Sequence, residues 1–530
     1  MTEPGKPYFP AGPFAARVGP GNRTRARETR PIYWRPARRG VLQISAAEKP
    51  KVRTMQTARI ILTGLACCLL ATYAAAQAQL TNDPFPAPLE AAKDIVAVDF
   101  VEFAKIPDAE GGQAPRLMHM AEAPGVQKYF FSTMRGALYG VSRDGKIVQP
   151  YLDINDPKWG VPVQFTGNER GLQSFAFHPQ FSERGRPGYG KFYTWLDTSK
   201  ISPTPDFTSG AASSTHDQVL LEWSAKDAQS AAYDGGAPRE IIRTAHPFPN
   251  HNGGQIAFNP LAQPGGADFG LLYVGSADGG NGGDPMNMAQ NLNSPFGKIL
   301  RIDPLGANSK NKRYGIPASN PYAADGKDDT LGEIYARGVR NPQRFTWDAK
   351  TGRMYVADIG QSAVEEISEV AAGANLGWNI WEASYRYTNR QVDVTGPRAG
   401  AGMTWPIAEY DHKDPILLGS NMAVTGVAVY RDRAIPQFTD LLIFGDNPSG
   451  EIFYIKADAP SQGGPGAIRR VLLNDGGKQK TLLQVINDKG KAEGKPAKPR
   501  ADLRFGFGAH GEIFVMNKQD GIIRRLVASR

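Results

Sequence analysis

Cysteine is nearly absent from this sequence. The 530 residues contain only two, Cys67 and Cys68, and both lie inside one short apolar segment near the N-terminus. If that segment is removed on export, the mature chain has no thiol. This excludes disulfide bonds, a thiol nucleophile and cysteine-ligated zinc, although an exported protein is in a compartment that permits disulfides.

Long hydrophobic runs are also missing. The apolar segment at 60–72 is short for a membrane span, which needs about 20 residues. A positively charged start at 55–59 precedes it and small residues at 74–78 follow it, a pattern typical of a secretory signal peptide. The sequence therefore predicts a signal peptide at 55–78 and a periplasmic or secreted protein with no stable membrane anchor. A stop-transfer anchor is the alternative.

Most of the chain has no excess of positive charge, although the formal net charge is +9. Residues 1–78 carry 13 Lys and Arg against three Glu, so the remainder is close to neutral. A nucleic-acid partner is therefore not indicated. Residues 1–54 are rich in Arg, Pro and Gly without an apolar period, and we expect a disordered extension upstream of a true start at Met55. A genuine basic tail is the alternative.

Glycine and proline are abundant, with 59 Gly and 41 Pro, which favours short strands and many turns. One pattern recurs in six copies: a turn glycine, then two or three apolar residues that include an aromatic. The copies lie at 136–141, 190–195, 270–274, 352–356, 450–455 and 511–515. This repetition predicts an all-β fold, a six-bladed β-propeller with long loop insertions over 95–530. A pair of β-sandwich domains is the alternative.

Two segments between the repeats have the composition of solvated loops. The segment at 202–214 is rich in Ser, Thr, Pro and Gly, and the segment at 459–499 is mostly Gly, Lys and Pro around one apolar stretch. Six lysines between 478 and 498 form a charge run. We interpret this run as a flexible surface in preference to a binding patch.

The segment at 249–258 is the most suggestive for chemistry. His251 is followed by Gly253 and Gly254 and then by an alternating apolar run, which places the imidazole at a loop tip just before a strand. An imidazole with an ordinary pKa near ~6.5 can accept a proton at neutral pH. A hairpin turn with a surface histidine is the structural alternative.

Four further segments place unusual polar residues beside predicted strands. Glu169 precedes a buried strand, a glycine-rich loop at 275–284 carries Asp278 and Asp284, and Arg340 precedes a turn. The fourth segment, 357–367, ends a strand with carbonyls and carboxylates close together.

In this order, the segments resemble the glucose/sorbosone dehydrogenase family from about Asp99 to the C-terminus. The most specific signal is Gly-x-Arg-Asn-Pro at 338–342 followed by Asp-x-Gly-Gln-x-x-x-Glu-Glu-Ile at 358–367. Members of this family are soluble quinoprotein sugar dehydrogenases that fold as six-bladed β-propellers and use pyrroloquinoline quinone with calcium. The resemblance implies a small-molecule sugar substrate and an external electron acceptor.

The resemblance also implies a role for each matching residue. His251 corresponds to the general base that takes the proton from the anomeric hydroxyl of the sugar. Arg340 and Asn341 correspond to the pair that hydrogen-bonds the quinone oxygens, where a guanidinium stabilises developing charge. Glu169 corresponds to a residue that lines the site.

The backbone carbonyls of Gly360 and Gln361 correspond to those that hold calcium, a hard cation suited to oxygen ligands. Simpler interpretations exist for single residues: Gly360 as a turn, Arg340 in an ion pair with Glu365 or Glu366, and Glu169 paired with Arg170. Asp278 and Asp284 stay open between a second calcium site and Asx turns.

The sequence departs from the family at two places that usually carry basic side chains for the carboxylates of the quinone. Here they read Asn-Pro-Ser at 447–449 and Ala-Asp-Leu at 501–503. Arg500 and Arg504 flank the second place and are the candidate replacements. Two other functions therefore stay open: a calcium-dependent lactone or ester hydrolase, and a non-catalytic propeller that binds glycan or protein.

Overall fold

The computed structural model describes residues 77–211, 213–419, 422–460 and 462–529. The predicted extension at 1–54 and nearly all of the predicted signal peptide at 55–78 lie outside these residues. Within them, no helix combines the length and the apolar character needed to cross a membrane.

Antiparallel sheets of four strands, each built from strands close together in the chain, make up most of the fold. One contains β3 (Leu117–Glu122), β4 (Lys128–Thr133), β5 (Ala137–Ser142) and β6 (Val148–Asp153). Another contains β7 (Leu172–Phe177), β8 (Lys191–Thr198), β9 (His216–Ser224) and β10 (Arg239–His246). The next contains β11 (Ile256–Phe258), β12 (Leu272–Ser276), β13 (Lys298–Ile302) and β14 (Ile334–Arg337). A fourth contains β15 (Pro342–Trp347), β16 (Met354–Asp358), β17 (Val364–Val370) and β21 (Ala408–Asp411).

A larger sheet joins the two ends of the described chain. Its C-terminal part holds β27 (Arg504–Phe507), β28 (Ile513–Met516) and β29 (Ile522–Val527). The N-terminal strand β2 (Val96–Lys105) pairs antiparallel with β29 and parallel with β25. The remaining strands are β22 (Val424–Tyr430), β23 (Leu441–Asp446), β24 (Ile452–Lys456), β25 (Arg469–Asp475) and the short β26 (Lys478–Lys480).

A small sheet is inserted between β17 and β21, with a strand from the start of the described chain at its edge. Its strands are β1 (Leu80–Thr81), β20 (Gln391–Asp393), β19 (Tyr385–Thr388) and β18 (Trp381–Glu382). Short 3-10 turns occur at η1 (Glu110–Gly112), η2 (Pro157–Trp159) and η3 (Pro436–Phe438).

The predicted solvated excursion at 459–499 is wrong in its central part, which forms strand β26 and helix α2 (Leu482–Ala492). Thr481 caps the helix by accepting from the backbone N–H of Gln484, whose side chain bonds back to the backbone of Thr481. Leu482, Val485 and Ile486 recur at helical spacing and are buried against the large sheet. Burial of this apolar stripe outweighs the loop-like composition on either side.

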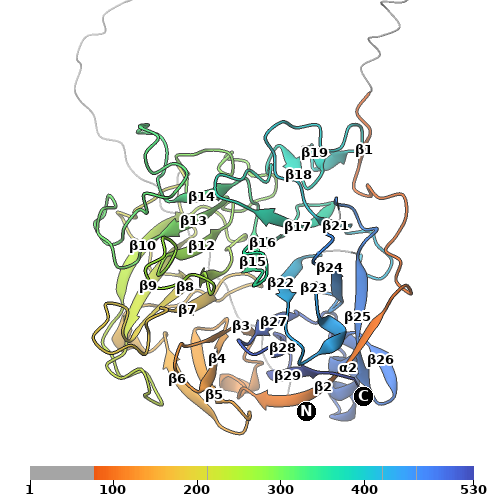
Figure 1. Ribbon diagram of the computed structural model, residues 1–530, viewed down its shortest axis with the longest axis horizontal. Coiled ribbons are helices and arrows are strands. Elements are labelled where there is room, and N and C mark those ends of the chain that lie inside the picture. The colour runs from red at the N-terminus through yellow and green to blue at the C-terminus, as the bar shows by residue number, and fades with distance from the viewer. Residues whose placement is uncertain (1–76, 212, 420–421, 461, 530) are drawn as a thin grey trace, which may run out of the picture. The chain divides into compact units, whose positions relative to one another are not determined.

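The all-β prediction is confirmed, and each of the six repeats forms a strand, namely β5, β8, β12, β16, β24 and β28. The innermost strands contact one another in a series: β3 contacts β7, β7 contacts β11, β12 from the sheet of β11 contacts β15, β15 contacts β22, and β22 contacts β27. Because β27 contacts β3, the series closes on itself. Figure 1 shows the sheets in chain order around a common centre, from orange through green to blue.

Hydrophobic clusters fill the spaces between neighbouring sheets. In β8, Phe192 packs with Phe130 of the preceding sheet, whereas its neighbour Tyr193 packs with Ile256 of the following sheet. Successive side chains of a strand point to opposite faces, so one strand serves two clusters. The ring of sheets thereby brings the starts of the innermost strands, and the loops before them, to one end of a central channel.

Candidate active site

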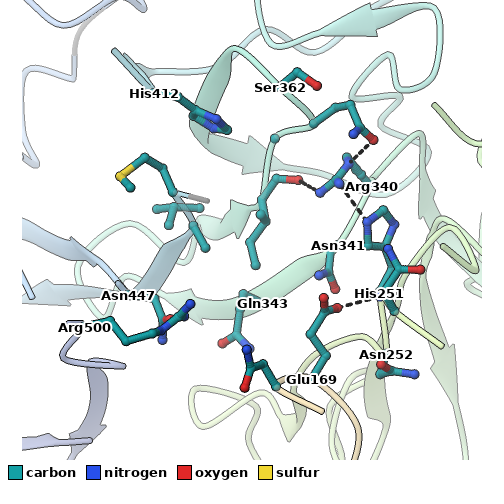
Figure 2. Close-up of a pocket in the computed structure, with 18 of the residues that line it drawn as sticks. Glu169, His251, Asn252, Arg340, Asn341, Gln343, Ser362, His412, Asn447 and Arg500 are labelled. Atoms are coloured by element: carbon teal, nitrogen blue, oxygen red, sulfur yellow. Dashed lines mark hydrogen bonds between the residues drawn. The ribbon is translucent and has the colours of Figure 1, made fainter. Parts of the chain in front are cut away.

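A cavity of about 680 Å³ lies at the end of the channel where the innermost strands begin. It is lined by loops that precede these strands, by residues at their first positions and by the loops that follow β16, β23 and β28. Its walls therefore come from segments far apart in sequence (Figure 2). The residues that the sequence proposes for catalysis, cofactor or the first calcium site all line this one cavity: Glu169, His251, Arg340, Asn341, Gly360, Gln361, Arg500 and Arg504. Asp278 and Asp284, the candidates for a second calcium site, do not line it.

His251 is buried, with 4% of its surface exposed, and its backbone has a left-handed φ of 57°. Its ring is held on both sides: Nδ1 lies 2.6 Å from Oδ1 of Asp278, and Nε2 lies 2.7 Å from Nη2 of Arg340. A carboxylate only accepts and a guanidinium only donates. The hydrogen therefore sits on Nδ1, and Nε2 carries the lone pair that faces Arg340 and the cavity.

Asp278 is the partner of His251 that sequence reasoning left undecided. It is fully buried, and its oxygens also accept from the backbone N–H of Gly280 (2.9 Å) and from Nε1 of Trp378 (2.8 Å). Burial opposes ionisation of Asp278, but the nearby His251 ring and the charge of Arg340 outweigh it and lower the pKa. The carboxylate is thus kept charged where it orients the histidine.

Asp284 has a different environment from Asp278. Its oxygens accept from the backbone N–H groups of Met288 and Ala289, at 2.9 and 2.8 Å, and so hold the loop that follows it. Burial raises the pKa of Asp284 to about 6. The hydrogen bonds of Asp278 are thus to His251, Trp378 and a turn N–H, and those of Asp284 are to the N–H groups of its own loop. Among the described residues, no group of three or more His, Cys, Asp or Glu side chains is placed to hold a metal ion.

Arg340 is fixed by its backbone and by its side chain. Its N–H donates to Asp358 (2.8 Å), Nε to Oε1 of Gln361 (3.1 Å) and Nη1 to the carbonyl of Ile359 (2.9 Å). The neighbouring N–H of Asn341 donates to the other oxygen of Asp358 at 2.6 Å. The side-chain oxygen of Asn341 is buried and has no partner within the described part of the chain.

The side chain of Glu169 contacts the backbone of His251, the candidate general base. One carboxylate oxygen of Glu169 accepts from the N–H of His251 at 2.6 Å (Figure 2). In the described chain, neither the alternative ion pair of Glu169 with Arg170 nor that of Arg340 with Glu365 forms. Glu365 instead binds Nε2 of His412 at 2.6 Å.

The loop with Gly360 and Gln361 is held from its N–H side. Four successive backbone N–H groups, from Gln361 to Val364, donate to one carboxylate oxygen of Glu382 at distances of 2.8 to 3.0 Å. The backbone carbonyls of Gly360 and Gln361 accept no hydrogen bond from the described residues. These two carbonyls are therefore available to a hard cation at the wall of the cavity.

Cations gather across the cavity from His251, as Figure 2 shows for Arg500. Arg500 donates to Oδ1 of Asn447 (3.0 Å) and to Asp502 (2.5 Å). Asn447 and Asp502 lie in the two stretches where the family's basic residues are missing. Arg500 therefore places a guanidinium beside both stretches from a different position in the sequence.

Lys518 is a site residue that sequence reasoning missed, because it follows β28 in a turn with no motif. It is 7% exposed and lines the cavity, and its Nζ donates to the carbonyl of Asn168 at 2.8 Å. Burial and then repulsion from Arg504 lower the pKa of Lys518 well below its ordinary value. Burial likewise lowers the pKa of Arg504 to about 10, and its Nε has no partner among the described residues.

The cavity thus has two chemically different ends. At one end, a buried histidine presents the lone pair of Nε2, and Arg340 lies beside it. At the other end, Arg500, Arg504 and Lys518 share Asp502 as a nearby carboxylate, so their positive charge is not balanced. This arrangement can accept a proton at one end and bind a polyanionic group at the other.

Solved structures with the same fold include two sugar dehydrogenases. The PQQ-bound form of aldose sugar dehydrogenase from Streptomyces coelicolor matches with a TM-score of 0.50 and 17% identity, over 80% of this chain and 96% of that one. The apo form of the soluble aldose sugar dehydrogenase from Escherichia coli matches with a TM-score of 0.54 and 16% identity, over 81% and 99%. At this level of identity the likeness shows the fold alone.

Two curated relatives of this chain are not named as sugar dehydrogenases. The HIPL1 protein of Arabidopsis thaliana is 28% identical over 384 residues, which are 63% of this chain and 51% of that protein. The human Hedgehog-interacting protein is 28% identical over 228 residues, 42% of this chain and 29% of that protein. The chain spans about half the length of the plant relative that it matches.

The sequence profile described as "Glucose / Sorbosone dehydrogenase" matches residues 114–466, which is more than half of the chain. This span contains the loop of His251, the Arg340–Asn341 pair and the loop of Gly360, and it ends before the cationic residues of the last strands. The chain belongs to the glucose/sorbosone dehydrogenase family.

Proposed function

We propose that this protein is an exported quinoprotein dehydrogenase that oxidises an aldose-type sugar at its anomeric carbon. The cofactors would be pyrroloquinoline quinone and calcium, and electrons would pass to an external acceptor. One observation carries the proposal: a single cavity places the Nε2 lone pair of His251 opposite an unbalanced cluster of cations. The predicted signal peptide at 55–78 supports export.

His251 would take the proton of the anomeric hydroxyl on Nε2. Asp278 keeps the hydrogen on Nδ1 and stabilises the imidazolium that forms. The guanidinium of Arg340 hydrogen-bonds to Nε2 of His251, so it must move aside for the sugar hydroxyl. It then lies where charge develops during the reaction. Bound pyrroloquinoline quinone would supply the acceptor for the hydride that leaves the anomeric carbon.

The residues present fit the quinone, which carries three carboxylates. Arg500, Arg504 and Lys518 offer charged donors, and the unpartnered Nε of Arg504 is a buried group that a carboxylate would satisfy. At the other end, Arg340 and Asn341 would face the quinone oxygens. These cations stand at other sequence positions than the basic residues of the family pattern, but they line the same cavity as Arg340 and Asn341.

The backbone carbonyls of Gly360 and Gln361 support calcium. The carboxylate of Glu382 accepts hydrogen bonds from the N–H groups of this loop and so fixes its backbone. Because the loop is already ordered, its carbonyls could bind a cation at low entropic cost. Two carbonyls are too few to complete the coordination of calcium, which takes six to eight oxygens. Cofactor oxygens and water would have to complete it.

We also propose that residues 95–530 form one six-bladed β-propeller. The closed series of contacts through β3, β7, β11, β15, β22 and β27 supports six blades around one channel. In this arrangement β2 would complete the last blade from the N-terminal side, because it pairs with β29. Closure of that kind would explain why the cavity is assembled from all parts of the chain.

A reconstitution experiment tests the function. Purified protein is mixed with calcium and pyrroloquinoline quinone, and the reduction of a dye is followed with a panel of aldoses. We expect turnover that requires both the quinone and a sugar. Hydrolysis of lactones or esters by the protein without the quinone would instead support the hydrolase alternative.

A binding function is the second candidate, and a specific observation supports it. One relative, 28% identical over 42% of this chain, is named for its interaction with Hedgehog. If the reconstituted protein shows no quinone-dependent and no hydrolytic activity, and calorimetry shows that the quinone does not bind, the binding alternative is favoured.

A further inference from the structure

A second cavity, of about 590 Å³, lies at the opposite end of the central channel. The same strands line both cavities at different depths. In β3, Met118 faces the first cavity and Met120 the second, and in β27, Arg504 faces the first and Phe507 the second. The two cavities share no lining residue, and none of the proposed catalytic residues lines the second one.

Arg344 lies at the inner end of this second cavity. It starts from β15, and its Nη2 donates at 2.8 Å to the carbonyl of Met118 in β3, while Nη1 donates at 2.6 Å to the carbonyl of Gln343. In the closed series of inner strands, β7 and β11 separate β3 from β15. The side chain of Arg344 thus reaches across the channel.

The charge of Arg344 has no counterion in the described chain. Only 5% of the residue is exposed, and it forms no ion pair with any described carboxylate. Burial and then repulsion from Arg504 lower the pKa of Arg344 well below its ordinary value. A buried and unpaired guanidinium is costly, and an anion that enters the cavity would relieve that cost.

A second polar side chain, that of His119, lines the same cavity. His119 is 8% exposed, and its Nδ1 has no hydrogen-bond partner among the described residues. The edge of its ring packs against Phe175, with centroids 5.4 Å apart. Burial and the charge of Arg344 both lower the pKa of His119, so its ring is neutral and can donate one hydrogen to an anion.

Aromatic side chains form part of the remaining walls, beside aliphatic and polar residues. Phe505 and Phe507 are nearly parallel, with ring centroids 5.8 Å apart and planes 10° apart, and Phe175 and Phe345 also line the cavity. The carboxylate of Glu122 lies in the lining as well, but it is paired with Arg143 at 2.6 Å. Rings of this kind favour a flat apolar ligand, and Arg344 favours a negative charge at its inner end.

We propose that this second cavity binds a small planar aromatic anion, an arene carboxylate or sulfonate. Its charged group would lie on Arg344 and Nδ1 of His119, and its ring would pack against the phenylalanines. This proposal does not depend on the proposed dehydrogenase activity, because it concerns the other end of the channel.

The test is calorimetric titration of the full chain with 2-naphthoate, beside the neutral 2-naphthamide of the same shape. We expect saturable binding of naphthoate at one site and at least about tenfold weaker binding of the amide, because a charged hydrogen bond is lost. Arg344→Gln should weaken naphthoate binding about ten- to a hundredfold, as expected for one charge-assisted contact. No saturable binding, or equal affinity for acid and amide, would overturn the proposal.

Two further variants keep the test decisive if Arg344→Gln does not fold. Phe507→Ser changes a partly exposed wall of the second cavity, and it should weaken naphthoate binding severalfold. Arg500→Gln removes a cation of the first cavity only, and it should leave naphthoate affinity within about twofold. Loss of binding in Arg500→Gln with no effect of Phe507→Ser would place the anion in the first cavity and refute the assignment.

Discussion

The guanidinium of Arg340 lies against the ring of His251, with Nη2 2.7 Å from Nε2. The same guanidinium is tied to Gln361 and to the carbonyl of Ile359, in the loop where calcium is proposed. Arg340 therefore connects the proposed base with the proposed metal loop. Any ligand that hydrogen-bonds to Nε2 has to displace or share this contact, so substrate binding and the position of Arg340 are coupled.

Replacing His251 and Arg340 separately should have different effects. His251→Ala removes the proton acceptor and should lower turnover by roughly 10² to 10⁴, with the quinone affinity nearly unchanged. Arg340→Ala should weaken quinone binding and slow reduction together, because its contacts exist in ground and transition states alike. Quinone titration and steady-state kinetics of both variants measure this. Sugar oxidation at the wild-type rate in His251→Ala would contradict the mechanism.

Asp278→Asn should impair catalysis without removing the base. The amide of asparagine no longer requires the hydrogen of His251 to be on Nδ1, so a fraction of the molecules has the other tautomer, without a free Nε2. We therefore expect kcat to fall about 10²-fold or more. Asp197→Asn is the matched control, because Asp197 makes a similar buried contact with His216 (3.1 Å) and neither residue lines the cavity. If both variants lose activity in proportion to their loss of thermal stability, Asp278 has only a structural role.

Lys518→Met should weaken quinone binding about ten- to a hundredfold, as expected for one charge-assisted contact. In the free protein, burial and Arg504 hold the pKa of Lys518 well below 10.5, and a bound carboxylate would raise it again. The complex then holds more protons than the free protein between these two pKa values. Affinity should therefore fall as pH rises through that window, and Lys518→Met should lose this dependence.

Calorimetry of quinone binding in two buffers with different ionisation enthalpies measures the proton uptake directly. Lys518→Arg serves as the control that keeps the charge and should retain most of the affinity. Quinone affinity that is unchanged in Lys518→Met would remove this residue from the site.

Removing residues 504–530 should abolish folding, because it deletes β27, β28 and β29 and leaves β2 without its antiparallel partner. Removing residues 77–86 is the milder comparison, since it deletes β1 with its two-residue pairing with β20 and the contact of Phe85 with Tyr385. Circular dichroism and thermal melts of both truncated chains distinguish the cases. A soluble product of the first deletion with unchanged β-sheet signal would contradict closure by the terminal strands.

The strands were predictable because their signals are local. A turn glycine followed by alternating apolar residues needs only a few neighbours to form a strand, as at 190–195 in β8 and 511–515 in β28. Helix α2 was missed because its apolar stripe is short and lies within a segment rich in Lys and Gly. Its burial against the large sheet depends on partners far away in the sequence.

The sequence by itself predicted the all-β class and a strand at each of six repeats, because turn chemistry and side-chain alternation act within short windows. A specific motif and the family resemblance also made His251, Arg340 and Asn341 candidates for the site. Only the tertiary structure decided which residues face one another. Asp278 and Trp378, 100 residues apart, are hydrogen-bonded to each other, and Asp278 orients His251. Lys518 supplies a cation that no local sequence pattern predicts. The physical reason is that closing the series of sheets on itself brings the ends of all inner strands together. Contacts across that channel depend on ring closure, which no single stretch of sequence encodes.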